Sequence, residues 1–293
     1  MKKILVVGNG FLGNSLADQI SKTNYKVMST CFSQNLDNKI KLDIKDLKSC
    51  SEVVSKFEPD VVINCSARTD IDFLEKNSQI SYDVNSEGVK NLAIVTAKYK
   101  KKFIQISTDS VFDGIKGRYT EEDKPNPVNV YAKSKLLAEK YVSEICTDYT
   151  IVRTNFYGFS IKKNNLLDWI VKNLKNNEKI IGFNDVFFSP VEISNLNEII
   201  LDLTKSNHNG ILHLASDEKI SKFEFIKQVS NSFGLNSNLI SEGSIDKINF
   251  IAKRPKDTSL KNNKIKKITK IKIRSVKEGL KELFQNEVQY PKQ

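Results

Sequence analysis

Tyr131 and Lys135 form the one tyrosine–lysine pair in the sequence whose members stand four residues apart in that order. On a helix, this spacing places both side chains on one face. An ammonium beside a phenol favours the phenolate and lowers the phenol's pKa, which would let Tyr131 exchange a proton near neutral pH. About one such pair is expected by chance in a chain with nine tyrosines, so its surroundings must decide its meaning.

Thr108 stands where a second reactive hydroxyl is needed. Ser107-Thr108-Asp109 directly follows the apolar run Phe103–Ile106, which we interpret as a strand. The carboxyl ends of strands are where open α/β sheets bind ligands, so the Thr108 hydroxyl can bond a substrate carbonyl. The alternative is a simple turn or helix cap, which Thr-Asp pairs often form. The combination with Tyr131 and Lys135 favours the catalytic interpretation.

A glycine-rich turn near the N-terminus predicts a phosphate site. Gly8, Gly10 and Gly13 form a GxGxxG between an apolar strand pattern and a helical pattern. Gly8 permits the tight turn, Gly10 lets the backbone approach a pyrophosphate, and Gly13 lets helix and strand pack closely. The N–H groups and dipole of the helix favour an anion, so we expect the pyrophosphate over Gly10, Phe11 and Leu12.

The residues after the second strand bear on the choice of dinucleotide. NAD-specific folds place an acid about 20 residues beyond the glycines, on the ribose 2′-hydroxyl. Here that position holds Ser33, and the first carboxylate is Asp37. Ser33 and Thr30 can donate hydrogen bonds to a 2′-phosphate, so we expect NADP(H) in preference to NAD(H). Asp43 and Ile44 are expected to flank the adenine, with a plain loop turn as the alternative.

Alternating strand and helix patterns predict the scaffold. Such alternation indicates a Rossmann-type doubly wound parallel sheet, with a smaller C-terminal lobe that binds substrate. We assign residues 1–155, with contributions from about 190–214, to the dinucleotide-binding domain and 156–293 mainly to the lobe. The expected strands are 4–7, 26–31, 60–64, 102–107, 149–153 and 211–214, and the expected helices are 11–21, 46–57, 80–99, 130–145, 166–174, 196–203 and 221–233.

Composition and charge narrow the class of protein. The chain is 39% hydrophobic, which permits a packed core, and it contains no apolar run of about 18 residues, so no membrane span is expected. The net charge of +11 comes from lysines spread along the chain, which does not favour nucleic acid binding but suits an anionic small ligand. Four scattered cysteines and two histidines give no zinc spacing and indicate a reducing, cytoplasmic setting.

These motifs together resemble the extended short-chain dehydrogenase/reductase family and, within it, the dTDP-4-dehydrorhamnose reductases. The resemblance begins with the glycine turn, Thr108, Tyr131 and Lys135. Further segments carry it along nearly the whole chain: residues 107–114 (STDSVFDG) resemble STDYVFDG, 64–72 (NCSARTDID) resemble NAAAYTAVD, 130–135 (VYAKSK) resemble VYGxTK, 153–158 (RTNFYG) resemble RTSWVYG, and 254–260 (RPKDTSL) resemble RPxxSxLD. Ser110 replaces a tyrosine of the family, and Phe156 replaces its tryptophan.

The resemblance implies reduction of the 4-keto group of a nucleotide-linked deoxy sugar by a nicotinamide cofactor. Tyr131 would protonate the new alkoxide, Lys135 would tune Tyr131 and hold the nicotinamide ribose, and Thr108 would hold the carbonyl oxygen. Asp109 would bind a sugar hydroxyl, with Phe156 beside the substrate. The resemblance also places three residues along the cofactor: Cys65, Ser66 and Ala67.

Two other functions share these features. A sugar-nucleotide epimerase or dehydratase would use the same fold and the same three residues. A regulatory subunit similar to the beta subunit of methionine adenosyltransferase would not need all three, so their joint presence favours an enzyme. Some members of the resembled family are metal-dependent dimers. The resemblance therefore allows a homodimer, and it leaves open whether the protein requires a metal.

Overall fold

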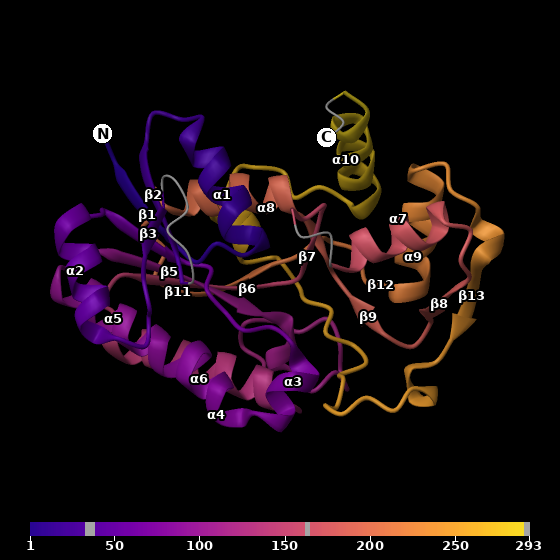
Figure 1. Cartoon of the computed structure of the whole chain (residues 1–293), viewed down its shortest axis with the longest axis horizontal. Helices are drawn as coiled ribbons and strands as arrows, with labels where there is room; N and C mark the ends of the chain where they lie inside the picture. Colours follow the sequence, from indigo (N-terminus) through magenta and orange to yellow (C-terminus); the bar gives the residue numbers. More distant parts are fainter. Residues whose placement is uncertain (33–38, 162–164, 290–293) are drawn as a thin grey trace.

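A parallel sheet of seven strands forms the centre of the structure (Figure 1). The structure is a computed structural model that describes residues 1–32, 39–161 and 165–289. The strand order is β11-β6-β5-β4-β1-β2-β3, and every neighbouring pair is parallel. The strands are β1 (Lys3–Val7), β2 (Lys26–Cys31), β3 (Lys39–Lys41), β4 (Val61–Asn64), β5 (Lys102–Thr108), β6 (Tyr149–Thr154) and β11 (Gly210–Leu214). The predicted doubly wound sheet is confirmed.

Helices cover both faces of the sheet, which explains why its strands read as continuous apolar runs. On one face lie α1 (Phe11–Ser21) and α8 (Ile193–Leu203), packed on each other and on β1, β4 and β6. The other face is covered by α2 (Leu47–Phe57), α5 (Gly88–Lys98) and α6 (Val130–Ile145) (Figure 1). Every residue of β4 and β5 is buried between these layers.

The helix predicted over residues 80–99 is wrong as a single element. It is divided into α4 (Ser78–Tyr82), a π-helical turn (Asp83–Glu87) and α5. The extra residue per turn points the buried side chain of Asn85 at another segment, where its Oδ1 accepts from Arg68 N at 2.8 Å and its Nδ2 donates to Arg68 O at 3.0 Å. Periodicity alone does not show such an insertion, because the apolar pattern resumes after it.

The smaller lobe combines the helices predicted over 166–174 and 221–233, which are confirmed, with short strands that the sequence patterns missed. Its strands form two-stranded pairs, β10 with β7, β12 with β9 and β13 with β8. Two- to four-residue strands carry too little periodicity for a sequence pattern. The elements are β7 (Phe156–Tyr157), α7 (Leu166–Lys175), β8 (Ile180–Phe183), β9 (Phe187–Phe188), β10 (Val191–Glu192), β12 (Ile220–Ser221), α9 (Lys222–Ser232), β13 (Ile240–Gly243) and α10 (Val276–Gln289); α3 (Ile71–Lys76) lies in the first part of the chain and was also missed.

The division of the chain into two domains stays a prediction. Its expected contribution from residues 190–214 agrees with the positions of α8 and β11, which belong to the sheet layer. Ile265 and Ile273 also pack in the core of that layer, although they lie far into the segment assigned to the lobe. The two parts therefore share one apolar core rather than meeting at a linker.

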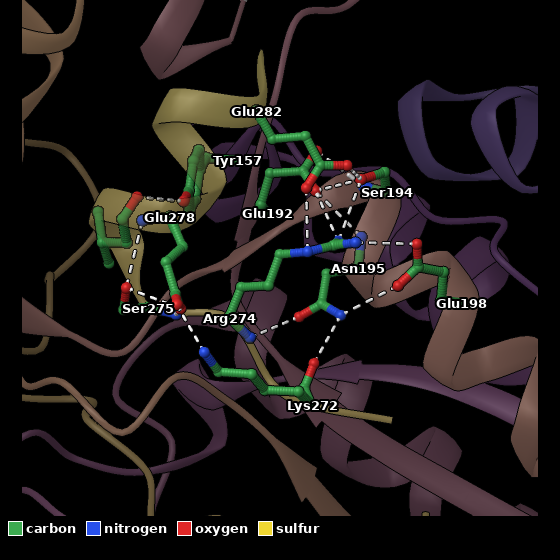
Figure 2. A network of polar contacts seen from close by, with 11 residues as sticks. Tyr157, Glu192, Ser194, Asn195, Glu198, Lys272, Arg274, Ser275, Glu278 and Glu282 are labelled. Carbon is green, nitrogen blue, oxygen red and sulfur yellow. Dashed lines mark hydrogen bonds and ion pairs between the residues drawn. The ribbon is translucent and has the colours of Figure 1, made fainter. Parts of the chain in front are cut away.

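Arg274 joins the C-terminal helix α10 to the start of α8. Its Nε lies 3.0 Å from Glu282 Oε2, its Nη2 lies 3.0 Å from Glu198 Oε1, and its Nη1 lies 3.8 Å from Glu192 Oε2 (Figure 2). The carboxylate of Glu192, which caps α8, is almost fully buried. One guanidinium thus balances three carboxylates from two helices and the strand β10 between them.

No helix in the described part of the chain combines the length and the apolar composition needed to cross a membrane.

Candidate active site

The sheet order reverses beside β1, and the sequence-predicted catalytic and glycine-turn residues gather at this point. The chain proceeds from β1 outward to β2 and β3, then returns to β4 on the other side. At such a switch point the loops after neighbouring strands diverge and leave a crevice at the carboxyl ends. The turn after β1, Cys65 after β4, Thr108 at the end of β5 and the start of α6 all border this crevice.

The glycine turn has the geometry that its three glycines predict. Gly8 has a φ of +98°, and a Cβ there would lie 2.8 Å from Ser66 Cα. A Cβ on Gly13 would lie 2.0 Å from Gly8 O, so only glycine lets α1 pack this closely on the turn. A Cβ on Gly10 would meet nothing within 4 Å. The turn is therefore tight on its protein side and open over Gly10.

The open side of the turn can hold a dinucleotide. No side chain caps α1 at Gly10, so the N–H groups of its first turn are available to an anion. The Leu12 side chain is buried and the Phe11 ring faces Phe156 with centroids 5.7 Å apart, so these two residues would offer their backbone to a pyrophosphate. The open space over Gly10 and the uncapped helix fit the expected cofactor.

The loop after β4 lies beside this turn, as the resemblance implied. Cys65 N donates to Val7 O at 2.9 Å, and the Ser66 backbone lies against Gly8. Burial raises the pKa of the Cys65 thiol to about 12, so the thiol is neutral. The position of Cys65, Ser66 and Ala67 suits a wall of the cofactor crevice, and their contact with the cofactor stays a prediction.

Thr108 and Tyr131 bring their hydroxyls together at the carboxyl end of β5. The Thr108 side chain lies close enough to the Tyr131 phenol to affect its pKa. Burial raises the pKa of Tyr131 to about 12, and the neighbouring Thr108 hydroxyl opposes that shift. The expectation that Lys135 lowers this pKa is wrong for this structure, because burial dominates. The phenol therefore keeps its proton near neutral pH, as a proton donor requires.

Lys135 lies behind this hydroxyl pair, on the same face of α6. Its Nζ donates to Ile106 O at 2.8 Å, and its side chain is buried. Burial lowers the pKa of Lys135 to about 8, while the charge of Glu139 opposes the shift. The bond to a β5 carbonyl two residues before Thr108 fixes the ammonium between the strand and the crevice.

Glu139 and Arg153 form a buried pair beneath Lys135 that the sequence analysis did not identify as functional. Arg153 Nη2 lies 2.6 Å from Glu139 Oε2, and Ser107 Oγ donates to Glu139 Oε1 at 2.5 Å. This pair ties α6, β5 and β6 together directly below the reactive hydroxyls. A charged residue inside the apolar run of residues 149–154 was the available signal, because arginine is rarely buried unless paired.

Asp109 is placed differently from the expectation that it binds a sugar hydroxyl. Its carboxylate is buried and accepts from Thr258 Oγ1 at 2.7 Å, Asn155 Nδ2 at 3.0 Å, and Thr108 Oγ1 and Ser110 Oγ at 3.2 Å each. Burial raises the pKa of Asp109, and these bonds oppose the shift. Four donors occupy its oxygens, so Asp109 holds Thr108 in place rather than facing the crevice.

The residues proposed for the adenosine half have mixed positions. Ser33 and Asp37 lie outside the described residues. Thr30 Oγ1 accepts from Gly8 N at 3.2 Å and is buried, so it supports the turn instead of reaching a 2′-phosphate. Asp43 and Ile44 follow β3 at its carboxyl end, but the Ile44 side chain packs in the core. Of these two residues, only Asp43 has a side chain outside the core that could contact the adenine, and that contact stays a prediction.

A cavity of about 810 Å³ lies between the start of α6 and the C-terminal loops of the lobe. Its lining includes Val128, three residues before Tyr131, and Asp257, next to Thr258. Arg254 also lines it: Nη2 pairs with Asp72 at 2.9 Å, while Nη1 is buried and has no hydrogen-bond partner among the described residues. An unpartnered guanidinium nitrogen in such a cavity suits an anionic group.

Within residues 1–32, 39–161 and 165–289, no group of three or more His, Cys, Asp or Glu side chains is arranged to hold a metal ion.

Comparison with known proteins gives a family match over almost the whole chain. The model described as "RmlD substrate binding domain" matches residues 1–289. A relative named dTDP-4-dehydrorhamnose reductase, from Aggregatibacter actinomycetemcomitans, is 27% identical over 90% of this chain and 92% of its own length. Methionine adenosyltransferase 2 subunit beta from Bos taurus is 25% identical over 81% of this chain and 74% of its own length.

A solved structure of a protein with the same reductase name also matches almost the whole chain. The crystal structure of dTDP-4-dehydrorhamnose reductase from Bacillus anthracis str. Ames, in complex with NADP, superimposes with a TM-score of 0.89. That chain is 29% identical, and the match covers 98% of this chain and 100% of the other.

Proposed function

The chain belongs to the RmlD substrate binding domain family, and on that premise we propose that it is an NADPH-dependent reductase of a nucleotide-linked 4-keto deoxy sugar. The observation that carries this proposal is the proximity of the Thr108 and Tyr131 hydroxyls at the switch point, with Lys135 on the same face of α6 as Tyr131 and bonded to Ile106 O. Two neutral donors beside an uncapped, glycine-lined helix end are what reduction of a carbonyl requires.

NADP(H) is the cofactor that we assign, in preference to NAD(H). The uncapped α1 and the open space over Gly10 fit its pyrophosphate. A relative of known structure, the reductase from Bacillus anthracis, binds NADP. When bound, the reduced cofactor supplies a hydride to the carbonyl carbon of the substrate.

Tyr131 would protonate the substrate oxygen, and Thr108 would stabilise the negative charge that develops on it. As the carbon accepts the hydride, the C=O π electrons move to oxygen, and the Tyr131 hydroxyl transfers its proton there to give an alcohol. On binding of substrate, Thr108 would turn its one hydroxyl proton from Asp109 Oδ1 to the same oxygen, and this hydrogen bond would strengthen as negative charge develops. The Tyr131 proton is then restored from solvent, so the reaction consumes one NADPH and one proton for each keto group.

Lys135, Asp109 and Phe156 would act around this step. The Lys135 ammonium lies behind the phenol, where it can stabilise a phenolate as it forms and bond the ribose of the nicotinamide half. Asp109 fixes the rotamer of Thr108 through the bonds described above. The Phe156 ring, in contact with Phe11, forms an apolar wall between the glycine turn and the lobe.

The nucleotide carrier fits the cavity beside α6. That cavity opens next to Val128, and its lining holds three cations, Lys253, Arg254 and Lys256, together with four aspartates. Lys256 pairs with Asp185 and Asp246, so Lys253 and Arg254 are the cations that we expect to meet the phosphates of a nucleotide sugar. The unpartnered Arg254 Nη1 is the specific feature in favour of an anion.

The alternatives differ in what they need from this site. An epimerase or dehydratase would use the same residues without net consumption of NADPH. A regulatory subunit would not need a proton donor such as Tyr131 beside a Thr108 hydroxyl that is bonded to Asp109. We favour a cytoplasmic enzyme, because Cys50 and Cys146 are buried thiols that donate to backbone oxygens at 3.6 and 3.7 Å.

A homodimer stays a prediction that sedimentation of the purified protein would check.

Replacement of Tyr131 by phenylalanine tests the catalytic assignment. Tyr131→Phe removes one hydroxyl and keeps the packed ring, so the free energy of unfolding and NADPH affinity should change little. The kcat for a dTDP-4-keto-6-deoxy sugar, followed by loss of NADPH absorbance, should fall by about 10²- to 10⁴-fold. Tyr141→Phe, which removes an exposed hydroxyl bonded to Glu87, is the matched control and should leave kcat unchanged. Full activity in Tyr131→Phe would show that another group supplies the proton.

A further inference from the structure

Lys222 of the smaller lobe lies near Asp109, next to Thr108, and neither the sequence motifs nor the mechanism above uses it. It is the first residue of α9, directly after the two-residue strand β12. Ser221 caps this helix in a reciprocal capping box with Glu224, and Lys222 N donates to Val186 O at 2.9 Å. The backbone of Lys222 is therefore held on both sides, so its side chain has a fixed origin.

The side chain of Lys222 extends over an aromatic ring toward Asp109. Its Nζ lies 3.2 Å from the centroid of the Phe188 ring, and its charge interacts with the Asp109 carboxylate. Phe188 and the Lys222 stem thus hold the ammonium on the lobe side of the Thr108–Asp109 turn. Tyr131 approaches the same turn from the opposite part of the molecule, on α6.

The ammonium of Lys222 has no hydrogen bond or ion pair with any residue of the described ranges. Asp109 does not supply one, because its oxygens already accept from four other side chains. Other lysines in similar environments are bonded: Lys219 pairs with Asp257, and buried Lys102 donates to Asp148 and two carbonyls. An ammonium with unused donors that lies between the Phe188 ring and the Asp109 carboxylate is costly unless a ligand accepts from it.

We propose that Lys222 contacts the substrate, donating a hydrogen bond from its ammonium to a hydroxyl oxygen of the sugar on the carbon next to the reacting carbonyl. This inference rests on the proposed function and makes Lys222 the residue by which the lobe recognises the sugar rather than its nucleotide. In this arrangement, residues of α6 and β5 contact the carbonyl oxygen of the substrate, and Lys222 of α9 orients its sugar ring. The lowered pKa of Lys222, about 8, with burial as its main cause, agrees with donors that are poorly solvated before substrate binds.

The test compares binding of dTDP-rhamnose with binding of dTDP alone, because only the former carries the sugar. Lys222→Met keeps the length of the side chain and can still pack on Phe188 through its sulfur. We expect its dissociation constant for dTDP-rhamnose to rise about 10- to 100-fold, the usual effect of losing a charged donor, while that for dTDP and for NADPH stays unchanged. Lys227→Met, an exposed lysine on the same helix, is the control and should match the wild type for all three ligands.

Three results separate this proposal from the proposed function. If wild-type protein binds dTDP-rhamnose more tightly than dTDP and Lys222→Met does so equally, the role of Lys222 is overturned and the reductase proposal stands. If wild-type protein gains no affinity from the sugar and consumes no NADPH with any keto sugar, the reductase proposal itself is overturned. Should Lys222→Met fold poorly, Lys222→Gln keeps a neutral donor, and an unchanged preference for dTDP-rhamnose in that variant and in Lys222→Ala would overturn the contact.

Discussion

Lys135 carries its positive charge into a site that solvent barely reaches. Only 3% of its surface is exposed, and burial lowers its pKa from the ordinary value of 10.5 to about 8. The charged form is thus less favourable in the folded than in the unfolded protein at neutral pH. Functional sites often retain such an unfavourable free energy of burying a charge. Here the proposed mechanism needs the charge of Lys135 beside the Tyr131 phenol.

The stability of the protein should therefore depend on pH through Lys135. Between about pH 8 and 10.5 the unfolded chain binds more protons at this lysine than the folded chain, so stability rises with pH in that window. Lys135→Met lacks this effect, and the wild type should gain about 2 kcal/mol on the variant between pH 7.5 and 10. Urea unfolding of both proteins at the two pH values measures the difference. Equal changes in both proteins would contradict the lowered pKa.

The turn before α1 separates two roles of glycine within one element. Gly13 is required for packing, because a Cβ would lie 2.0 Å from Gly8 O, whereas Gly10 has no protein atom within 4 Å of such a Cβ. Gly13 therefore serves the fold, and Gly10 serves the approach of a ligand.

Paired substitutions at this turn should separate stability from binding. Gly13→Ala forces α1 away from the turn, so the free energy of unfolding should fall by about 1–3 kcal/mol, with loss of NADPH binding. Gly10→Ala should leave the unfolding midpoint in urea nearly unchanged and still raise the dissociation constant for NADPH, measured by fluorescence titration. If Gly10→Ala binds NADPH as tightly as the wild type, the pyrophosphate does not lie over this residue.

Sequence patterns predicted the long elements of the sheet layer, the position of Thr108 at the end of a strand and that of Tyr131 and Lys135 on one helix, because periodicity and motif spacing are local properties. They did not predict the π-helical turn, since the bonds of Asn85 to Arg68 join segments far apart in the chain. The direction of the Tyr131 pKa shift failed for the same reason: burial depends on tertiary packing. Lys222 and Thr258 lie more than 90 residues from Tyr131 and carry no motif of their own that assigns them to this site.

At the scale of the whole molecule, the lobe is fastened to the sheet layer through polar as well as apolar contacts. Arg274 holds α10 to α8, and Tyr157 Oη donates to Val276 O at 3.0 Å (Figure 2). Tyr157 follows Phe156 in β7, which pairs with β10 and its buried Glu192. The position of the Phe156 wall is thus linked to the C-terminal helix.

Removal of Arg274 should destabilise the whole chain, because it leaves the buried Glu192 carboxylate without its cation. We expect Arg274→Met to lower the free energy of unfolding by about 2 kcal/mol, the typical loss for a charged hydrogen bond. Urea unfolding measures this change, and Lys281→Met, an exposed lysine of α10, is the control that should leave it unaltered. A midpoint in Arg274→Met equal to that of the control would show that apolar contacts alone hold α10.

The central claim is that this protein moves a hydride from NADPH to the keto carbon of a nucleotide sugar. The most direct measurement uses NADPH deuterated at the transferred position of the nicotinamide, with dTDP-4-keto-6-deoxy sugar and the wild-type protein. The account predicts that NADPH is consumed in proportion to product, and that mass spectrometry and NMR find one deuterium in the product, at C4 of the sugar. A product without deuterium at C4, or a sugar converted while the NADPH concentration stays constant, would contradict the account.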